Sequence, residues 1–185
     1  MSIEEMNAFF WLLILAGVEK SWDVPVRVLF LDEKTNPMYK AAMSINRFED
    51  IRKIIRFDDK RTREARAIDD KLAPIRYIWD LFIGNCRTKM VPEEFLTIDE
   101  QLLPFRGRCG FIQYMPSKPA KYGVKIFWLC ESKSAYAIDG IVYTGRKPDE
   151  PVQKNVGMNI VKQLAKSIEG TSRNITTENL LLVHN

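Results

Sequence analysis

Apolar residues recur at helical spacing in three segments of the first half of the chain. The first segment, residues 2–17, is apolar on nearly all sides, with Ser2 placed to cap its start and Gly17 to end it. A second helix follows Ser44. A third opens at Pro74 and places apolar residues on one face: Ile75, Ile78, Trp79, Phe82 and Cys86. The pattern predicts a helical region whose first helix is deeply buried.

The second half of the chain has runs of β-forming residues separated by turn residues, which is typical of β-strands. Strands are predicted over 95–105, 122–130 and 136–143, the last two joined as a hairpin. Residues 156–168 return to helical spacing, and 173–183 is a fourth strand candidate. A helical crossover can lay the last strand parallel to the first and beside it. We therefore expect an α+β fold with a helical region over 1–92 and a sheet domain over 93–185.

Composition excludes several classes of protein. Hydrophobic residues make up 46% of the chain, which suits a buried core and not a disordered chain. The net charge of +4 permits a polyanionic partner without arguing for one. The three cysteines form no C-x-x-C pair, so neither a disulfide framework nor a zinc ribbon is supported, and we expect a reducing compartment. The apolar run from Phe9 to Val18 is about half of a membrane span, which favours a buried helix and no membrane partner.

Basic residues gather in two places. From Arg52 to Arg66 the chain has seven basic and three acidic residues, which predicts either a solvated connector or a surface that meets DNA phosphates. A second basic series surrounds Tyr114 and Tyr122 and consists of Arg106, Arg108, Lys118, Lys121 and Lys125. Such interleaving suits DNA backbone contact with occasional base stacking. The alternative is a solvated hairpin edge, where lysines discourage strand pairing.

Several stretches resemble one family, in the same order along nearly the whole chain. The two most specific are Leu-Thr-Ile-Asp-Glu-Gln at 96–101 and Lys-Pro-Ala-Lys-Tyr-Gly at 118–123. Supporting stretches lie at 58–60, 71–76, 78–82, 105–109 and 170–177. These stretches resemble piggyBac transposases and the host proteins derived from them.

The resemblance implies a metal-dependent DNA strand-transfer fold. By analogy, the strand order is the start of an RNase H-like sheet, with three antiparallel strands, a helix and a parallel fourth strand. In the family three aspartates hold two divalent ions, Mg²⁺ or Mn²⁺, that assist an in-line phosphodiester displacement. Asp99 matches the first aspartate. Glu178 stands where the second is expected, and its extra methylene moves the oxygens. The third would lie beyond residue 185.

We expect adjacent parallel strands to bring Asp99 and Glu178 side by side as a degenerate catalytic and metal-binding pair. The resemblance then predicts a nuclear, DNA-binding remnant of a transposase that does not catalyse strand transfer in this form. Two alternatives stay open. One is a fragment of an active cut-and-paste transposase whose remaining aspartate lies in a longer product. The other is a truncated gene product without a cellular role.

The resemblance also assigns roles to the two regions. Residues 1–92 resemble the dimerisation and DNA-binding part of the family, and 93–185 its catalytic domain. A homodimer is implied in the same way, although the residues themselves show no dimer surface.

Overall fold

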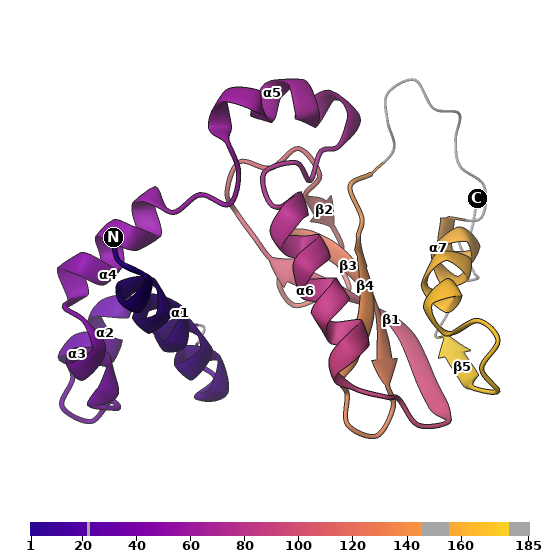
Figure 1. Cartoon of the computed structure of the whole chain (residues 1–185), viewed down its shortest axis with the longest axis horizontal. Helices are drawn as coiled ribbons and strands as arrows, with labels where there is room; N and C mark the ends of the chain where they lie inside the picture. The colour runs from indigo at the N-terminus through magenta and orange to yellow at the C-terminus, as the bar shows by residue number, and fades with distance from the viewer. Residues whose placement is uncertain (22, 146–155, 178–185) are drawn as a thin grey trace. The chain divides into compact units, whose positions relative to one another are not determined.

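The computed structural model describes residues 1–21, 23–145 and 156–177 (Figure 1). Contacts within the chain form two compact units, Met1–Arg56 and Phe57–Asn185. The helices α5 (Lys60–Asp69) and α6 (Arg76–Lys89) therefore belong to the same compact unit as the sheet. The expected division at residue 92 separates regions by their role in the family, and it stays a prediction.

The first unit contains four helices: α1 (Ile3–Val18), α2 (Val26–Leu31), α3 (Met38–Ala42) and α4 (Ile45–Ile54). The Ser2 hydroxyl accepts from the backbone N–H of Glu5 and the Ser44 hydroxyl from that of Arg47, which confirms both predicted helix starts. The Arg47 guanidinium also binds the Glu5 carboxylate at 2.5 Å, so an ion pair joins α4 to α1. The core of this unit consists of Phe9, Leu12, Leu29, Phe30, Tyr39, Phe48 and Ile51.

The expected deep burial of the first helix is wrong within this unit. Only Phe9 and Leu12 of α1 are buried. Large apolar side chains elsewhere on α1 are open to solvent, including Leu13, Ile14 and Val18. The helix is apolar on most sides, but the three short helices beside it cover only one of them.

The second unit is built on a curled mixed sheet with strands β1 (Phe95–Pro104), β2 (Gln113–Tyr114), β3 (Tyr122–Glu131), β4 (Ala137–Val142) and β5 (Asn174–Thr177). β3 pairs antiparallel with β1 on one side and with β2 and β4 on the other. β5 pairs parallel with β1, from Phe95–Asn174 to Ile98–Thr177. The helix α7 (Val156–Ala165) and a short 3₁₀ turn, Lys166–Ile168, precede β5. The predicted α+β class, hairpin and parallel strand are confirmed.

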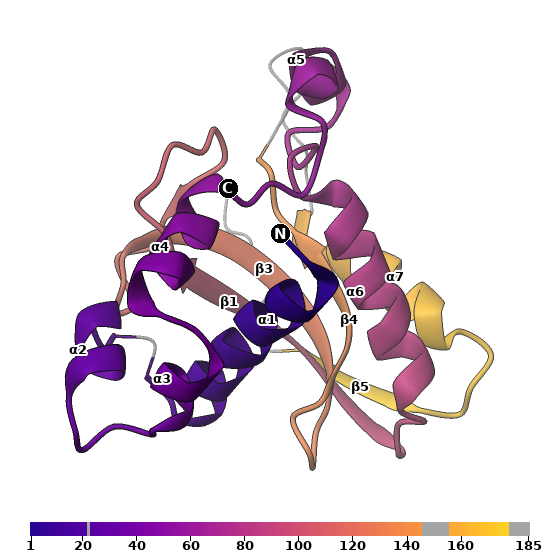
Figure 2. The same cartoon turned by 60° about the vertical axis from the view of Figure 1, so that its left-hand side comes forward.

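Helices cover both faces of the sheet. On one face α7 contributes Ile160 and Leu164 to a core that also holds Leu96, Ile98, Phe127, Leu129, Ile138 and Ile168. Side chains of a strand alternate between faces, so Trp128 points to the opposite face, where its ring lies 5.5 Å from that of Trp79 on α6. The views in Figures 1 and 2 agree that α6 runs beside the hairpin of β3 and β4.

The predicted apolar face of α6 packs on the sheet only in part, through Trp79 and Cys86. Ile83 and Cys86 are buried, whereas Ile75, Ile78 and Phe82 are exposed. The apolar stripe of α6 is wider than the strip of β4 that it contacts, so half of the stripe is left open. No helix in the described part of the chain is long and apolar enough to cross a bilayer.

Candidate functional site

Asp99 lies in the middle of β1, on the face opposite the α7 core. The strand alternates, with Leu96, Ile98 and Leu102 buried and Asp99 exposed between them. The Asp99 Oδ1 atom accepts a hydrogen bond from the backbone N–H of Glu100 at 2.6 Å. The buried neighbours hold the backbone of β1, and Asp99 is therefore presented to solvent from a well-anchored strand.

The Asp99 carboxylate faces a cavity of about 700 Å³. The walls include Gln101 on β1, Trp128 and Cys130 on β3, and Lys118 from the loop before β3. The Trp128 indole Nε1–H donates to the Gln101 Oε1 atom at 2.9 Å, which fixes one wall. Burial raises the pKa of the Cys130 thiol, and the negative charge of Asp99 raises it further. This cavity, named here the Asp99 cavity, is thus open and partly apolar, and its lining includes the carboxylates of Asp99 and Glu100.

The predicted partner of Asp99 lies outside the described residues. The parallel pairing of β1 and β5 is observed up to the pair Ile98–Thr177, one residue before Asp99 and Glu178 in the two segments. The strand arrangement that the expectation requires is therefore present in the described part. The position of Glu178 stays a prediction.

The described residues do not by themselves form a metal centre. Among residues 1–21, 23–145 and 156–177, no group of three or more His, Cys, Asp and Glu side chains is placed to hold an ion. Glu100, the neighbour of Asp99, is already paired with the Lys125 ammonium at 2.5 Å and lies 3.9 Å from that of Lys118. Within the part of the chain that the structure describes, Asp99 therefore offers a carboxylate to an ion without two further ligands beside it.

The five predicted DNA contacts separate into two groups. Lys118 and Lys125 flank Glu100, and the Lys125 ammonium also lies 4.7 Å from the centre of the Phe127 ring. Their charges are partly neutralised by Glu100. Three remain: Arg106, Arg108 and Lys121 are exposed, and no hydrogen bond or ion pair to their side chains is found among the described residues. Their role as DNA contacts stays a prediction.

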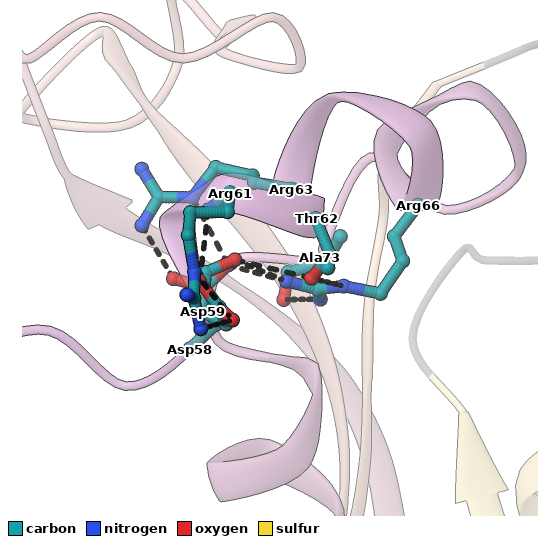
Figure 3. Close-up of polar contacts among 7 residues, drawn as sticks. All are labelled: Asp58, Asp59, Arg61, Thr62, Arg63, Arg66 and Ala73. Carbon is teal, nitrogen blue, oxygen red and sulfur yellow. Dashed lines mark hydrogen bonds and ion pairs between the residues drawn. The ribbon is translucent and has the colours of Figure 1, made fainter.

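The basic run from Arg52 to Arg66 contains an arginine cluster that was not predicted (Figure 3). The carboxylate of Asp58 is 6% exposed and pairs with the guanidinium groups of Arg63 and Arg66. Arg66 also donates to the Ala73 carbonyl at 2.9 Å, which ties α5 to the segment before α6. The Arg63 guanidinium, assisted by that of Arg66, lowers the pKa of Asp58 to about 2.

Asp59, the next residue, caps α5 by accepting from the backbone N–H of Arg61 at 2.9 Å. The two aspartates therefore serve the fold of this segment, and part of the positive charge of the run is used internally. A signal was present in the sequence, since an acidic pair directly before a helix with several arginines is typical of a cap with ion pairs.

Comparison with known proteins decides the family. A family model described as Transposase IS4 matches residues 1–185. The chain belongs to this transposase family. A solved structure, the piggyBac transposase synaptic complex with hairpin DNA, is 40% identical and superposes with a TM-score of 0.87 over 98% of this chain and 37% of that chain. The predicted resemblance to piggyBac proteins is confirmed.

Two human relatives give the same result. Over 175 residues, or 91% of this chain, it is 27% identical to the human piggyBac transposable element-derived protein 3 and, equally, to the human chimeric ERCC6-PGBD3 protein. The chain spans 28% of the first relative and 16% of the second. The Asp99 cavity thus belongs to a piggyBac transposase-related chain that corresponds to a part of its longer relatives.

Proposed function

We propose that this chain is a piggyBac transposase-derived domain that binds the DNA backbone and does not catalyse strand transfer in this form. The observation that carries the proposal is the exposed trio Arg106, Arg108 and Lys121, whose side chains are not used by the described part of the fold. Phosphates attract such cations without regard to base sequence. Further support comes from the similar solved structure, which is a transposase complex with hairpin DNA.

The second unit is proposed to be RNase H-like. The support is the strand arrangement, in which β3 lies between β4 and β1 and the parallel β5 lies outside β1. In this arrangement Asp99 stands on the strand beside β5, and we expect the Glu178 carboxylate to follow β5 next to it. Mg²⁺ and Mn²⁺ prefer oxygen ligands of this kind. The nucleus as location and a homodimer are proposed from family membership alone.

Loss of catalysis is proposed because of the residue at position 178. A glutamate there carries one methylene more than the aspartate of the family, and Mg²⁺ tolerates little deviation from octahedral geometry. The second candidate, a fragment of an active transposase, is favoured by Asp99 itself, which is exposed at a cavity that an ion can enter. No observation favours a product without a cellular role.

Backbone binding is tested with duplex DNA and fluorescence anisotropy across a salt series. The triple variant Arg106→Ala, Arg108→Ala, Lys121→Ala is compared with a variant that loses the same charge elsewhere, by Lys34→Ala, Lys89→Ala and Lys162→Ala. We expect only the first variant to weaken the salt dependence, so that the negative slope of log affinity against log salt becomes smaller in magnitude by about 2 to 3. An equal loss in both variants, or salt-independent binding, would reject the proposed contact surface.

Catalysis is tested separately by nicking of supercoiled DNA with Mg²⁺ or Mn²⁺. We expect no nicking by the wild-type chain. Nicking that is gained with Glu178→Asp and lost again with Asp99→Ala would show that position 178 alone separates this chain from an active site. Nicking by the wild-type chain that depends on Asp99 would favour the second candidate.

A further inference from the structure

A smaller pocket adjoins the Asp99 cavity. It has a volume of about 320 Å³ and is lined by Pro104, Phe105, Arg106, Ala120 and Tyr122. Pro104 and Ala120 also line the Asp99 cavity, so the two hollows share a wall. A polymer that binds in one of these hollows can therefore reach the other.

The pocket presents two aromatic rings to solvent. Tyr122 is 51% exposed, and its ring is backed by that of Tyr114, with ring centres 4.8 Å apart and an angle of 37° between their planes. Phe105 is 42% exposed. Gly107 lies against the Phe105 ring so closely that a Cβ atom there would be 2.6 Å from a ring carbon. The glycine therefore allows the ring to fold back over its own turn.

Exposed aromatic rings beside cations are suited to a planar ligand that carries a negative charge. A nucleobase stacks on Phe and Tyr rings, and an arginine at the same site can bind the phosphate that follows the base. Arg106 lines the pocket itself, and the exposed Lys121 precedes Tyr122 in the chain. The volume lies at the lower end of the roughly 300–1,000 Å³ that is usual for small-ligand sites, which suits one base.

The geometry points to this pocket as a stacking site for an unpaired nucleobase of the DNA strand whose backbone passes the Asp99 cavity. The inference rests on the proposed DNA binding and makes it more specific. A base within a duplex has both faces stacked and its edge paired, so it can enter only by leaving the stack, at a cost in free energy. A base that is unpaired at a bulge, a flap or a hairpin tip can enter at little cost.

The test uses the full chain and three fluorescent DNA probes of equal length. The first is fully paired, the second has one unpaired adenine, and the third has an abasic residue in place of that adenine. We expect the chain to bind the unpaired-adenine probe about 5- to 150-fold more tightly than either of the others, since stacking contributes about 1–3 kcal/mol per base. Because the abasic probe needs no change in the protein, the comparison does not depend on how a variant folds.

Protein variants then locate the stacking site. Tyr122→Ala and Phe105→Ala should each lose most of the preference for the unpaired adenine, whereas Tyr122→Phe should keep it because the ring face remains. Tyr77→Ala removes another exposed tyrosine, on α6, and serves as the matched control. Thermal melting of each variant confirms that it is folded.

The outcomes separate this inference from the proposed function. Equal affinity for the three probes, with salt-dependent binding that still needs Arg106, Arg108 and Lys121, would overturn the stacking site and leave backbone binding intact. A preference that survives Tyr122→Ala and Phe105→Ala would also overturn it. Absence of salt-dependent binding to any probe would reject both.

Discussion

At the scale of single residues, Asp58 shows that charged residues of a basic run can form ion pairs within the chain, which leaves fewer of them for a partner. Its covered carboxylate holds Arg63 and Arg66, and Arg66 in turn holds the Ala73 carbonyl. The charge excess in the sequence thus overstates the cations that are available to DNA. The same is true of Lys118 and Lys125 beside Glu100.

The Asp58 cluster predicts a stability that depends on acid pH. The folded pKa of Asp58 is about 2, below its ordinary value of 3.8, so its contribution is present above about pH 4 and is lost as the pH falls toward 2. Asp58→Asn should lower the melting temperature at neutral pH, and the difference from wild type should shrink as the pH approaches 2. Thermal melts followed by circular dichroism from pH 7 to pH 2 measure this.

A matched control for this prediction is Asp80→Asn. Asp80 pairs with Arg76 at the surface, with 3.4 Å between the charged atoms, and an exposed pair of this kind contributes little. Its melting temperature should follow that of wild type at every pH. A deficit of Asp58→Asn that is the same at pH 7 and pH 2 would contradict the assigned role of the carboxylate.

At the scale of elements, the pairing of β1 with β3 leaves no room for a side chain at Gly123. A Cβ atom at this position would lie 2.1 Å from the backbone oxygen of Leu103. Gly123→Ala should therefore destabilise the chain by about 1–3 kcal/mol, as overpacking usually does, because a backbone atom cannot turn aside. Chemical denaturation followed by tryptophan fluorescence gives the free energy of unfolding.

Gly84 offers the opposite case on α6. A Cβ atom there meets nothing within 4 Å. Gly84→Ala should raise the free energy of unfolding by about 0.5–1 kcal/mol through helix propensity alone. If both glycine variants changed stability in the same direction, the close approach of the two strands would not be the cause.

The elements also show which features could be predicted from the sequence. The hairpin, the crossover helix and the parallel β5 follow from local periodicity and from the rule that governs such connections. The packing of α6 was predictable only in part, because its apolar stripe is wider than its contact and only tertiary structure selects the residues that are buried. The two-residue β2 is too short for any period to reveal.

The candidate site also has features that could be predicted from the sequence and features that could not. Asp99 and its exposed setting could be inferred from the motif and the alternation of β1. The pairing of Glu100 with Lys118 and Lys125 could not, because it joins residues that meet only when the strands pair. The pocket of Phe105 and Tyr122 is hidden from the sequence for the same reason, since its two rings come from different strand ends.

At the scale of the whole molecule, several large apolar side chains are left open on both units, among them Ile14 on α1 and Phe82 on α6. Water contact with such surfaces is unfavourable, and contiguous ones favour association. We predict that the isolated chain self-associates. Sedimentation velocity should show species larger than the 21.5 kDa monomer that increase with concentration.

Variants on α6 test the cause of the association. Phe82, which is 48% exposed, can be changed to glutamate with little effect on melting, and Phe82→Glu should shift the distribution toward monomer. Ile83→Glu, at a buried neighbouring position, should instead abolish cooperative melting. A wild-type chain that sediments as a single monomer at every concentration would remove the basis for this prediction.

Because the Asp99 side chain points to solvent, the residue at this position can change during evolution without loss of the fold. Selection for a well-folded protein acts on Ile98 and Leu102 of the same strand, because their side chains are buried. Selection for folding hardly constrains position 99, where asparagine or serine would preserve the strand equally well. If many descendants of this gene retain an acidic residue at position 99, the carboxylate has a function of its own. If the position varies at random, only the fold is under selection.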